Sequence, residues 1–207
     1  MASHLIDGTI ASMTDTELLK RANDLQKEAR RVLEDLSLFE RIRKIADPEL
    51  VGSAKTGLMI MPDIDIHAWM QHPDLARVSA LMPEFAQLPT IQMVHFNNYR
   101  ELRRDHRKDR ISFPHAYYLG IRSIEPSGEW KIDMWFGERG SIGDYDDSEL
   151  GDISEEERLS ILRLKEAWHE GKGYRDGVIS TDFYKAVIQH GVRDIPGFES
   201  YLKTKGS

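Results

Sequence analysis

Three aspartates in two separate segments have the types and spacing of a metal site. Asp63 and Asp65 alternate with isoleucine, and Asp133 lies in a later segment whose alternate positions are apolar. Side chains alternate between the two faces of a β-strand, so Asp63 and Asp65 share one face. Their Cα atoms then lie roughly 6 to 7 Å apart, because a strand rises about 3.3 Å per residue. Two carboxylates at this separation can reach one hard cation or bridge two.

Magnesium is the cation that this arrangement favours. It takes oxygen ligands at about 2.0 to 2.1 Å and is usually held by one or two carboxylates together with substrate phosphates. A third carboxylate from a neighbouring strand completes a two-metal site, whereas three carboxylates without a cation repel one another. We therefore predict a metal site of Asp63, Asp65 and Asp133. The alternative is structural: Asp63 caps a turn, while Asp65 and Asp133 keep edge strands soluble.

Polar residues around the aspartates extend the predicted site. Gly52 and Ser53 follow a short apolar segment about ten residues before Asp63. Glycine lets the backbone approach a phosphate closely, and the serine hydroxyl and nearby amides can bind it. Lys131 shares a face with Asp133, where it can pair with a phosphate or with Asp133 itself. A solvated strand lysine fits the pattern equally well.

Other conspicuous side chains have simpler explanations. We expect His67, on the face of Asp63 and Asp65, to pack at the edge of the site. The basic run 103–110 is expected to be a solvated loop, with anion binding as the alternative. Four aromatic residues are expected to lie mostly in the core, although one could stack on a base: Tyr117, Tyr118, Trp130 and Trp135.

Apolar periodicity and turn residues predict the elements that position these side chains. Helical spacing over 14–45 predicts one long helix, or two with a break near Leu36 and Ser37. Thr14 and Glu17 have the spacing of a capping box at its start. Strands are predicted at 49–51, 63–69, 90–99, 117–124 and 129–136, and the last two are expected to form a hairpin. Further helices are predicted at 73–85, from Ser154 to 168, from Ser180 or Thr181 to 191, and at 196–202.

The length of 207 residues allows one large domain, or a domain with a small appendage. We predict four parts along the chain. They are an N-terminal segment 1–13 that is disordered or foreign to the natural protein, a main domain 14–139, a linker 140–153 and a helical C-terminal extension 154–207.

Composition excludes several classes of function. No run of eighteen apolar residues is present, so we expect no membrane partner. The chain has no cysteine, which excludes a disulfide framework and a thiolate metal site, and a cytoplasmic protein is the default expectation. The formal net charge of −7 argues against non-specific binding of nucleic acid, which needs a basic face.

The pattern as a whole resembles the nucleotidyltransferase superfamily, whose fold is shared by DNA polymerase beta and the aminoglycoside and lincosamide nucleotidyltransferases. The resemblance rests on Gly52-Ser53, on Asp63-Ile64-Asp65 about ten residues later, and on Asp133 in a subsequent strand, and it covers 49–136. It implies an α/β (α+β) fold, with a mixed sheet flanked by helices. The small helical C-terminal extension would then shape the acceptor side of the site.

The resemblance also implies an activity: magnesium-dependent transfer of a nucleoside monophosphate from a nucleoside triphosphate such as ATP to a hydroxyl acceptor, with pyrophosphate leaving. It implies that Asp63 and Asp65 hold the metal on the triphosphate. Asp133 would bind a second magnesium ion and take the proton of the acceptor, and Ser53 would bind the β- or γ-phosphate. A small molecule is the leading expectation for the acceptor.

Two points leave alternatives open. The segment after Ser53 contains Gly57 and ends in Pro62, so the helix that follows the glycine–serine pair in this superfamily must be short here. A protein-modifying or antitoxin-like member of the same fold is one alternative. A catalytically silent member that serves as a binding module is another.

Overall fold

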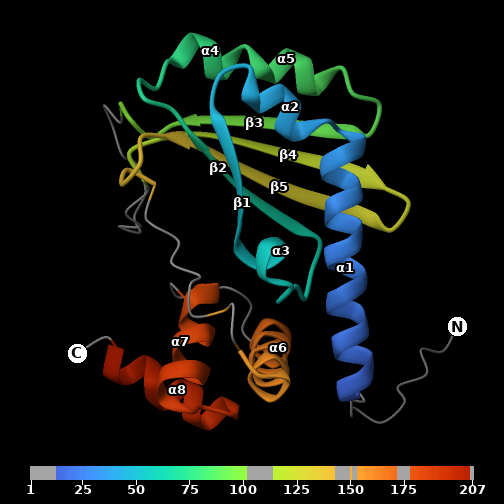
Figure 1. Cartoon of the computed structure of the whole chain (residues 1–207), viewed down its shortest axis with the longest axis vertical. Helices are drawn as coiled ribbons and strands as arrows, with labels where there is room; N and C mark the ends of the chain where they lie inside the picture. Colours follow the sequence, from blue (N-terminus) through green and yellow to red (C-terminus); the bar gives the residue numbers. More distant parts are fainter. Residues whose placement is uncertain (1–12, 102–113, 143–149, 151–152, 172–177, 206–207) are drawn as a thin grey trace, which may run out of the picture.

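The computed structural model describes residues 13–101, 114–142, 150, 153–171 and 178–205. It contains one five-stranded mixed sheet, with helices against it and three further helices at the C-terminal end (Figure 1). This confirms the predicted mixed sheet flanked by helices. The strands are β1 (Asp47–Val51), β2 (Asp63–Trp69), β3 (Ile91–Asn98), β4 (Tyr117–Glu125) and β5 (Gly128–Gly137). The helices are α1 (Asp15–Asp35), α2 (Leu38–Arg43), α3 (Gly52–Thr56), α4 (Leu75–Ser79), α5 (Leu81–Ala86), α6 (Glu155–Gly171), α7 (Ser180–His190) and α8 (Ile195–Lys205).

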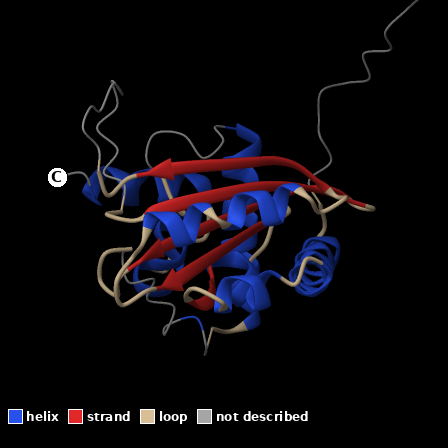
Figure 2. Cartoon of the chain, turned by 90° about the horizontal axis from the view of Figure 1, so that it is seen from above, coloured by secondary structure: helices blue, strands red, loops and turns tan. Residues whose placement is uncertain are grey.

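The strand order is β1-β2-β5-β4-β3, and only β2 and β5 run parallel. β4 and β5 form the predicted hairpin across Pro126 and Ser127. Viewed from above, the strands fan out with the twist of an open sheet (Figure 2). The parallel register sets Asp65 directly opposite Asp133, and Asp63 opposite Lys131.

The alternation in the central strands divides the sheet into an apolar face and a polar face. Ile64 and Ile66 of β2 and Ile132 and Met134 of β5 are fully buried on the apolar face. They pack against side chains of α1, α2, α4 and α5 in one hydrophobic core. Each such side chain contributes about 1.5–3 kcal/mol by leaving water. The residues between them therefore lie on the polar face, among them Asp63, Asp65 and His67 of β2, Lys131, Asp133 and Trp135 of β5, and Tyr118 and Arg122 of β4.

The N-terminal helical region is two helices, as one of the two sequence alternatives predicted. The capping box of Thr14 and Glu17 is present at the start of α1. The break falls at Ser37, whose left-handed φ of 49° cannot continue an α-helix. α1 contributes Ala29 and Val32 to the core beneath the sheet. Nearer its start, it contributes Leu18 and Ala22 to a second core among the C-terminal helices.

The C-terminal helices pack around that second core, which includes Ile161, Phe183 and Phe198. α6 begins after a capping box of Ser154 and Glu157, as predicted. The prediction that Ser180 or Thr181 caps α7 was wrong by one or two residues. Ser180 is already the first helical residue and the N-cap is Ile179, because the carboxylate of Asp182 accepts a hydrogen bond from the Ile179 backbone N–H at 3.0 Å.

Several other expectations changed or fall outside the described residues. The helix predicted at 73–85 is divided into α4 and α5 at Ala80. The basic run 103–110, nearly all of 1–13 and most of the 140–153 linker lie outside the described residues, and the four-part division of the chain stays a prediction. Within the described part of the chain, no helix combines the length and apolarity needed to cross a membrane.

Candidate metal centre

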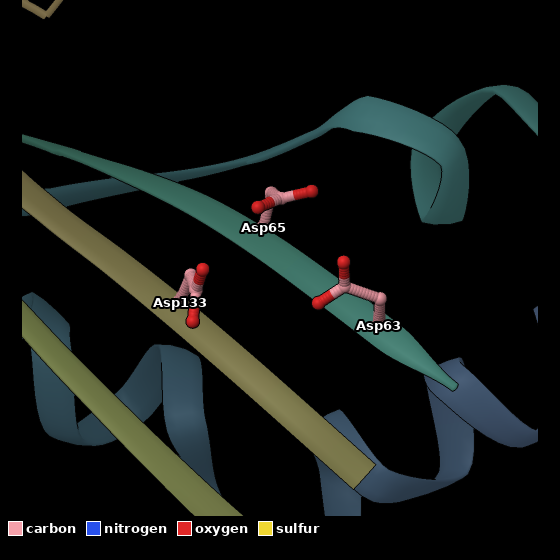
Figure 3. Close-up of side chains that lie close together, drawn as sticks. All are labelled: Asp63, Asp65 and Asp133. Carbon is pink, nitrogen blue, oxygen red and sulfur yellow. The ribbon is translucent and has the colours of Figure 1, made fainter. Parts of the chain in front are cut away.

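Asp63 and Asp65 of β2 and Asp133 of β5 bring their carboxylates together on the polar face. One ligand oxygen from each lies within 4.8 Å of the others. Figure 3 shows the three side chains leaving two adjacent strands and gathering on the same side of the sheet. The clustering follows from two facts: the aspartates alternate with buried isoleucines, and the parallel register aligns Asp65 with Asp133. The structure thus assembles the three residues that the sequence singles out.

Burial and mutual repulsion make these carboxylates costly to ionise. Burial, followed by the charges of Asp63 and Asp133, raises the pKa of Asp65 to about 7. The pKa of Asp63 is also raised, chiefly by burial, which outweighs the opposing charge of Lys131. Among the described residues, Asp63 Oδ1 is a buried oxygen without a hydrogen-bond donor. A hard divalent cation fits this set, because all its ligands are oxygens and one of them accepts no hydrogen bond in the described part of the chain.

Lys131 lies among the three aspartates. Its Nζ is 2.7 Å from Asp133 Oδ2 and 3.4 Å from Asp63 Oδ1, the latter an ion pair rather than an aligned hydrogen bond. Burial alone would lower the pKa of Lys131, but the charges of Asp63 and Asp133 outweigh burial and raise it above the ordinary value. Of the roles that the sequence left open for Lys131, pairing with Asp133 is the one present in the structure.

Tyr118 of β4 engages the other oxygen of Asp133. The tyrosine hydroxyl donates a hydrogen bond to Asp133 Oδ1 at 2.8 Å. Burial, followed by the charge of Asp133, raises the pKa of Tyr118, so the phenol keeps its proton and remains a donor. Gly120 makes this possible, because a Cβ at that position would overlap the tyrosine hydroxyl. Sequence patterns placed Tyr118 among the core aromatics and gave no signal for this contact.

The glycine–serine pair lies beside Asp65, where β1 ends and α3 begins. Gly52 has a φ of +70°, and a Cβ there would come within 2.8 Å of Asp65 Oδ2. Both facts require glycine. α3 is only five residues long and ends at Gly57 with a left-handed φ of 75°. The short helix expected after Ser53 is therefore observed, and the binding of phosphate by Ser53 stays a prediction.

A buried lysine from the C-terminal helices approaches the same region. Lys165 of α6 is 2% exposed and donates a hydrogen bond to the Leu58 carbonyl at 2.6 Å, in the segment between α3 and β2. Its charge is among those that lower the pKa of Asp65. Lys165 was not predicted from the sequence. A lysine on an apolar helix face, four residues after Ile161 and three before Trp168, was an available signal.

His67 is 9% exposed and packs edge to face against Trp69, in agreement with a packing role at the edge of the site. Trp130 and Tyr117 of the hairpin are buried, as expected for core aromatics. Trp135 is only half-buried and contacts Tyr118, with ring centroids 4.8 Å apart. The polar face beside the aspartates is therefore partly aromatic.

Comparison with known proteins places this geometry in a fold. No protein-family model matches the chain, and no curated protein matches it in sequence. Solved structures do match. The GLD-2/RNP-8 complex matches with a TM-score of 0.54 at 11% identity over 84% of this chain and 64% of that chain. A cytoplasmic RNA terminal U-transferase matches with a TM-score of 0.52 at 17% identity over 84% and 54% of the two chains.

A poly(A) polymerase complex, GLD-2 with GLD-3, also matches, with a TM-score of 0.50 at 14% identity over 83% of this chain and 57% of that chain. The chain thus spans between 54% and 64% of the lengths of these three structures. At such low identities the likeness establishes the fold alone. The chain shares the fold of these three structures and carries an acidic triad on the polar face of its sheet.

Proposed function

We propose that this chain is a magnesium-dependent nucleotidyltransferase, which moves a nucleoside monophosphate from a nucleoside triphosphate to a hydroxyl acceptor. One observation carries the proposal. Asp63, Asp65 and Asp133 offer oxygens within 4.8 Å of one another on the polar face of a nucleotidyltransferase-type sheet. Three carboxylates this close together repel one another unless a cation binds between them. Mg²⁺ is the hard cation that commonly binds together with triphosphates.

The residues of the site divide the chemistry. Bound magnesium would neutralise the triphosphate and polarise its α-phosphate. Asp63 and Asp65 would hold the ion that accompanies the nucleotide, beside the glycine–serine turn that faces Asp65. Asp133 accepts the proton of the acceptor hydroxyl as its oxygen bonds to the α-phosphorus, and the bond from that phosphorus to pyrophosphate breaks.

The buried ammonium of Lys165 supports the nucleotide side of this proposal. It lies behind the connection from α3 to β2 and adds positive charge near Asp65. Ser53 at the start of α3 would bind the β- or γ-phosphate, with the backbone of Gly52 allowing a close approach.

A small molecule is our proposed acceptor. The net charge of −7 disfavours a long polyanionic acceptor, whose binding needs a basic face. The matching structures favour a second candidate, because they include a poly(A) polymerase complex and an RNA terminal U-transferase. A short RNA 3′ end is therefore the acceptor to test against small molecules and protein hydroxyls.

Binding is the first test. Calorimetric titration with a non-hydrolysable ATP analogue should show binding by the parent protein only with Mg²⁺ present. Asp65→Asn should abolish it, because a neutral amide cannot replace an anionic ligand of a hard cation. Asp47→Asn is the matched control on the same sheet, since that side chain is 77% exposed. Equal affinity in Asp65→Asn and the parent would overturn the metal site.

An acceptor screen is the second test. The parent protein is incubated with Mg²⁺, labelled nucleoside triphosphates and aminoglycosides, lincosamides, protein hydroxyls or short RNA. Label transferred to a small molecule supports the proposed acceptor, whereas label on RNA replaces it with the second candidate. A parent that binds no nucleotide at millimolar Mg²⁺ would refute the enzyme and leave a catalytically silent binding module.

A further inference from the structure

We propose that Lys131 is a built-in cation of this centre, which holds Asp133 before any divalent ion binds and must be displaced when an ion reaches Asp133. The inference rests on the metal site of the proposed function. It assigns Lys131 a role toward the metal and removes it from the set of phosphate ligands. It also makes the three carboxylates unequal, so that ions load in a fixed order.

The contacts of the three carboxylates differ in the way that this role requires. Both oxygens of Asp133 are taken by donors of the chain itself, Oδ2 by Lys131 at 2.7 Å and Oδ1 by the Tyr118 hydroxyl at 2.8 Å. Asp63 has only the longer 3.4 Å ion pair with Lys131, and its buried Oδ1 has no hydrogen-bond donor within the described residues. The pair from β2 is thus open to a cation, while Asp133 is already satisfied.

Charge balance supports the same order. The three ionised carboxylates carry a formal charge of −3, and Lys131 brings the cluster to −2. One divalent ion at Asp63 and Asp65 neutralises that remainder. A second divalent ion at Asp133 would be repelled by the positive charge of Lys131, so it would bind well only after the ammonium moves away.

Lys131 is placed where it can leave. The parallel register sets its backbone opposite Asp63, and its side chain is 38% exposed. A lysine has a flexible four-carbon stem and a strongly hydrated head, so it can swing into water at low cost. On its other side it faces Arg122 of β4, which is paired with Glu129 at 3.6 Å. Among the described residues, the carboxylates that pair with Lys131 are those of Asp63 and Asp133.

Titration with Mn²⁺ alone, without nucleotide, tests the inference. The parent should bind one ion tightly and a second one weakly. Lys131→Met should bind the second ion about fivefold more tightly, the effect of removing one competing ion pair worth about 1 kcal/mol. Arg122→Met is the matched control, because Arg122 is on the same face but pairs with Glu129. Its affinity for the second ion should stay within about twofold of the parent.

Thermal unfolding in EDTA gives an independent readout. Lys131→Met should melt below the parent without metal, and Mn²⁺ should raise its melting temperature by more than it raises that of the parent. Lys131→Arg keeps the charge and should melt close to the parent in EDTA. If Lys131→Met folds only with Mn²⁺ present, the expected loss of stability without metal has gone to completion. Lys131→Gln then serves for the titration.

Two outcomes would overturn the inference. Unchanged Mn²⁺ affinity and melting temperature in Lys131→Met would make Lys131 a bystander. Unchanged Mn²⁺ affinity with lost affinity for the Mg²⁺–ATP analogue would make it a phosphate ligand. Either result leaves the proposed function standing, since the parent would still bind metal and nucleotide. Failure of the parent to bind any divalent ion would refute both proposals.

Discussion

On β2, Ile64 and Ile66 are fully buried beneath the helices, whereas Asp63 and Asp65 on the opposite face crowd against Asp133. The two faces are built from alternate residues of the same strand. Burial on the apolar face stabilises the folded protein. The crowded carboxylates on the polar face, whose pKa values are raised, destabilise it in part. Adjacent residues in one strand therefore do opposite things to stability.

The difference shows how carboxylates that repel one another can be held together on the polar face. A one-residue slip of β2 would exchange the two faces, so burial of Ile64 and Ile66 locks the register. The same lock holds Asp65 opposite Asp133. If this comparison is right, substitutions on the polar face should change metal binding and turnover with little loss of stability, and those on the apolar face should do the reverse.

The largest expected effect is on turnover. Asp133→Asn should lower the rate of nucleotidyl transfer by about 10²- to 10⁴-fold, because the amide cannot accept the acceptor's proton. Nucleotide affinity should change little, since Asp63 and Asp65 remain. Steady-state kinetics with the acceptor found in the screen, beside calorimetric titration of the nucleotide, separates the two. A rate within a few-fold of the parent would make Asp133 a structural strand residue.

On the opposite face, Ile66→Ala should lower the free energy of unfolding by about 2–5 kcal/mol, because it leaves a cavity in the core. Urea unfolding measures this loss. Mn²⁺ affinity of the folded variant should match the parent, since the side chain points away from the aspartates. A metal affinity reduced as much as in Asp65→Asn would show that the two faces are not independent.

The dependence of stability on pH sharpens the comparison. The pKa of Asp65 is about 7 in the folded protein, against an ordinary value of 3.8, so between about pH 4 and pH 7 the folded state holds more protons than the unfolded state. The free energy of unfolding of the metal-free protein should therefore fall as pH rises through this window. Asp65→Asn should flatten the fall, although not abolish it, because the pKa of Asp63 is raised as well.

Urea unfolding in EDTA at about pH 5 and about pH 8 measures that slope. Above pH 7 the metal-free Asp65→Asn variant should be more stable than the parent. Asp47→Asn, on an exposed position of β1, should keep the slope of the parent. Identical slopes in Asp65→Asn and the parent would contradict the raised pKa.

The smallest effect is expected at Tyr118. Tyr118→Phe removes one hydrogen bond to Asp133 and should cost about 0.5–1.5 kcal/mol of stability without metal. It frees Asp133 Oδ1, so affinity for the second Mn²⁺ should rise slightly. Thermal unfolding and metal titration, compared with Tyr117→Phe in the core, check both. Weaker metal binding in Tyr118→Phe would mean that Tyr118 orients Asp133 for the ion and does not compete with it.

Local patterns predicted the parts of the site that depend on strand alternation. The faces of Asp63, Asp65, Lys131 and Asp133 and the hairpin of β4 and β5 follow from period-two alternation and turn residues, which are local properties. The contact of Tyr118 with Asp133 could not be predicted in this way, because it depends on cross-strand register and on the space above a glycine in β4.

The approach of α6 was equally hidden from local patterns. Lys165 reaches the Leu58 carbonyl across more than a hundred residues of chain, and a helical pattern does not say what a helix packs against. The cap of α7 was missed for a smaller reason. Ser180 and Thr181 both suit an N-cap, but Asp182 supplies the hydrogen bond to the backbone one residue earlier.

The parallel pairing of β2 with β5 also bears on how the chain folds. β4 and β5 are neighbours in sequence and can pair quickly, whereas β2 meets β5 only after the intervening α4, α5, β3 and β4 are enclosed in one long loop. We therefore expect the contact between Asp65 and Asp133 to be among the last to form. A divalent ion that bridges the two strands would slow their separation and lengthen the lifetime of the native state, which slower amide hydrogen exchange along β2 in the presence of Mg²⁺ would reveal.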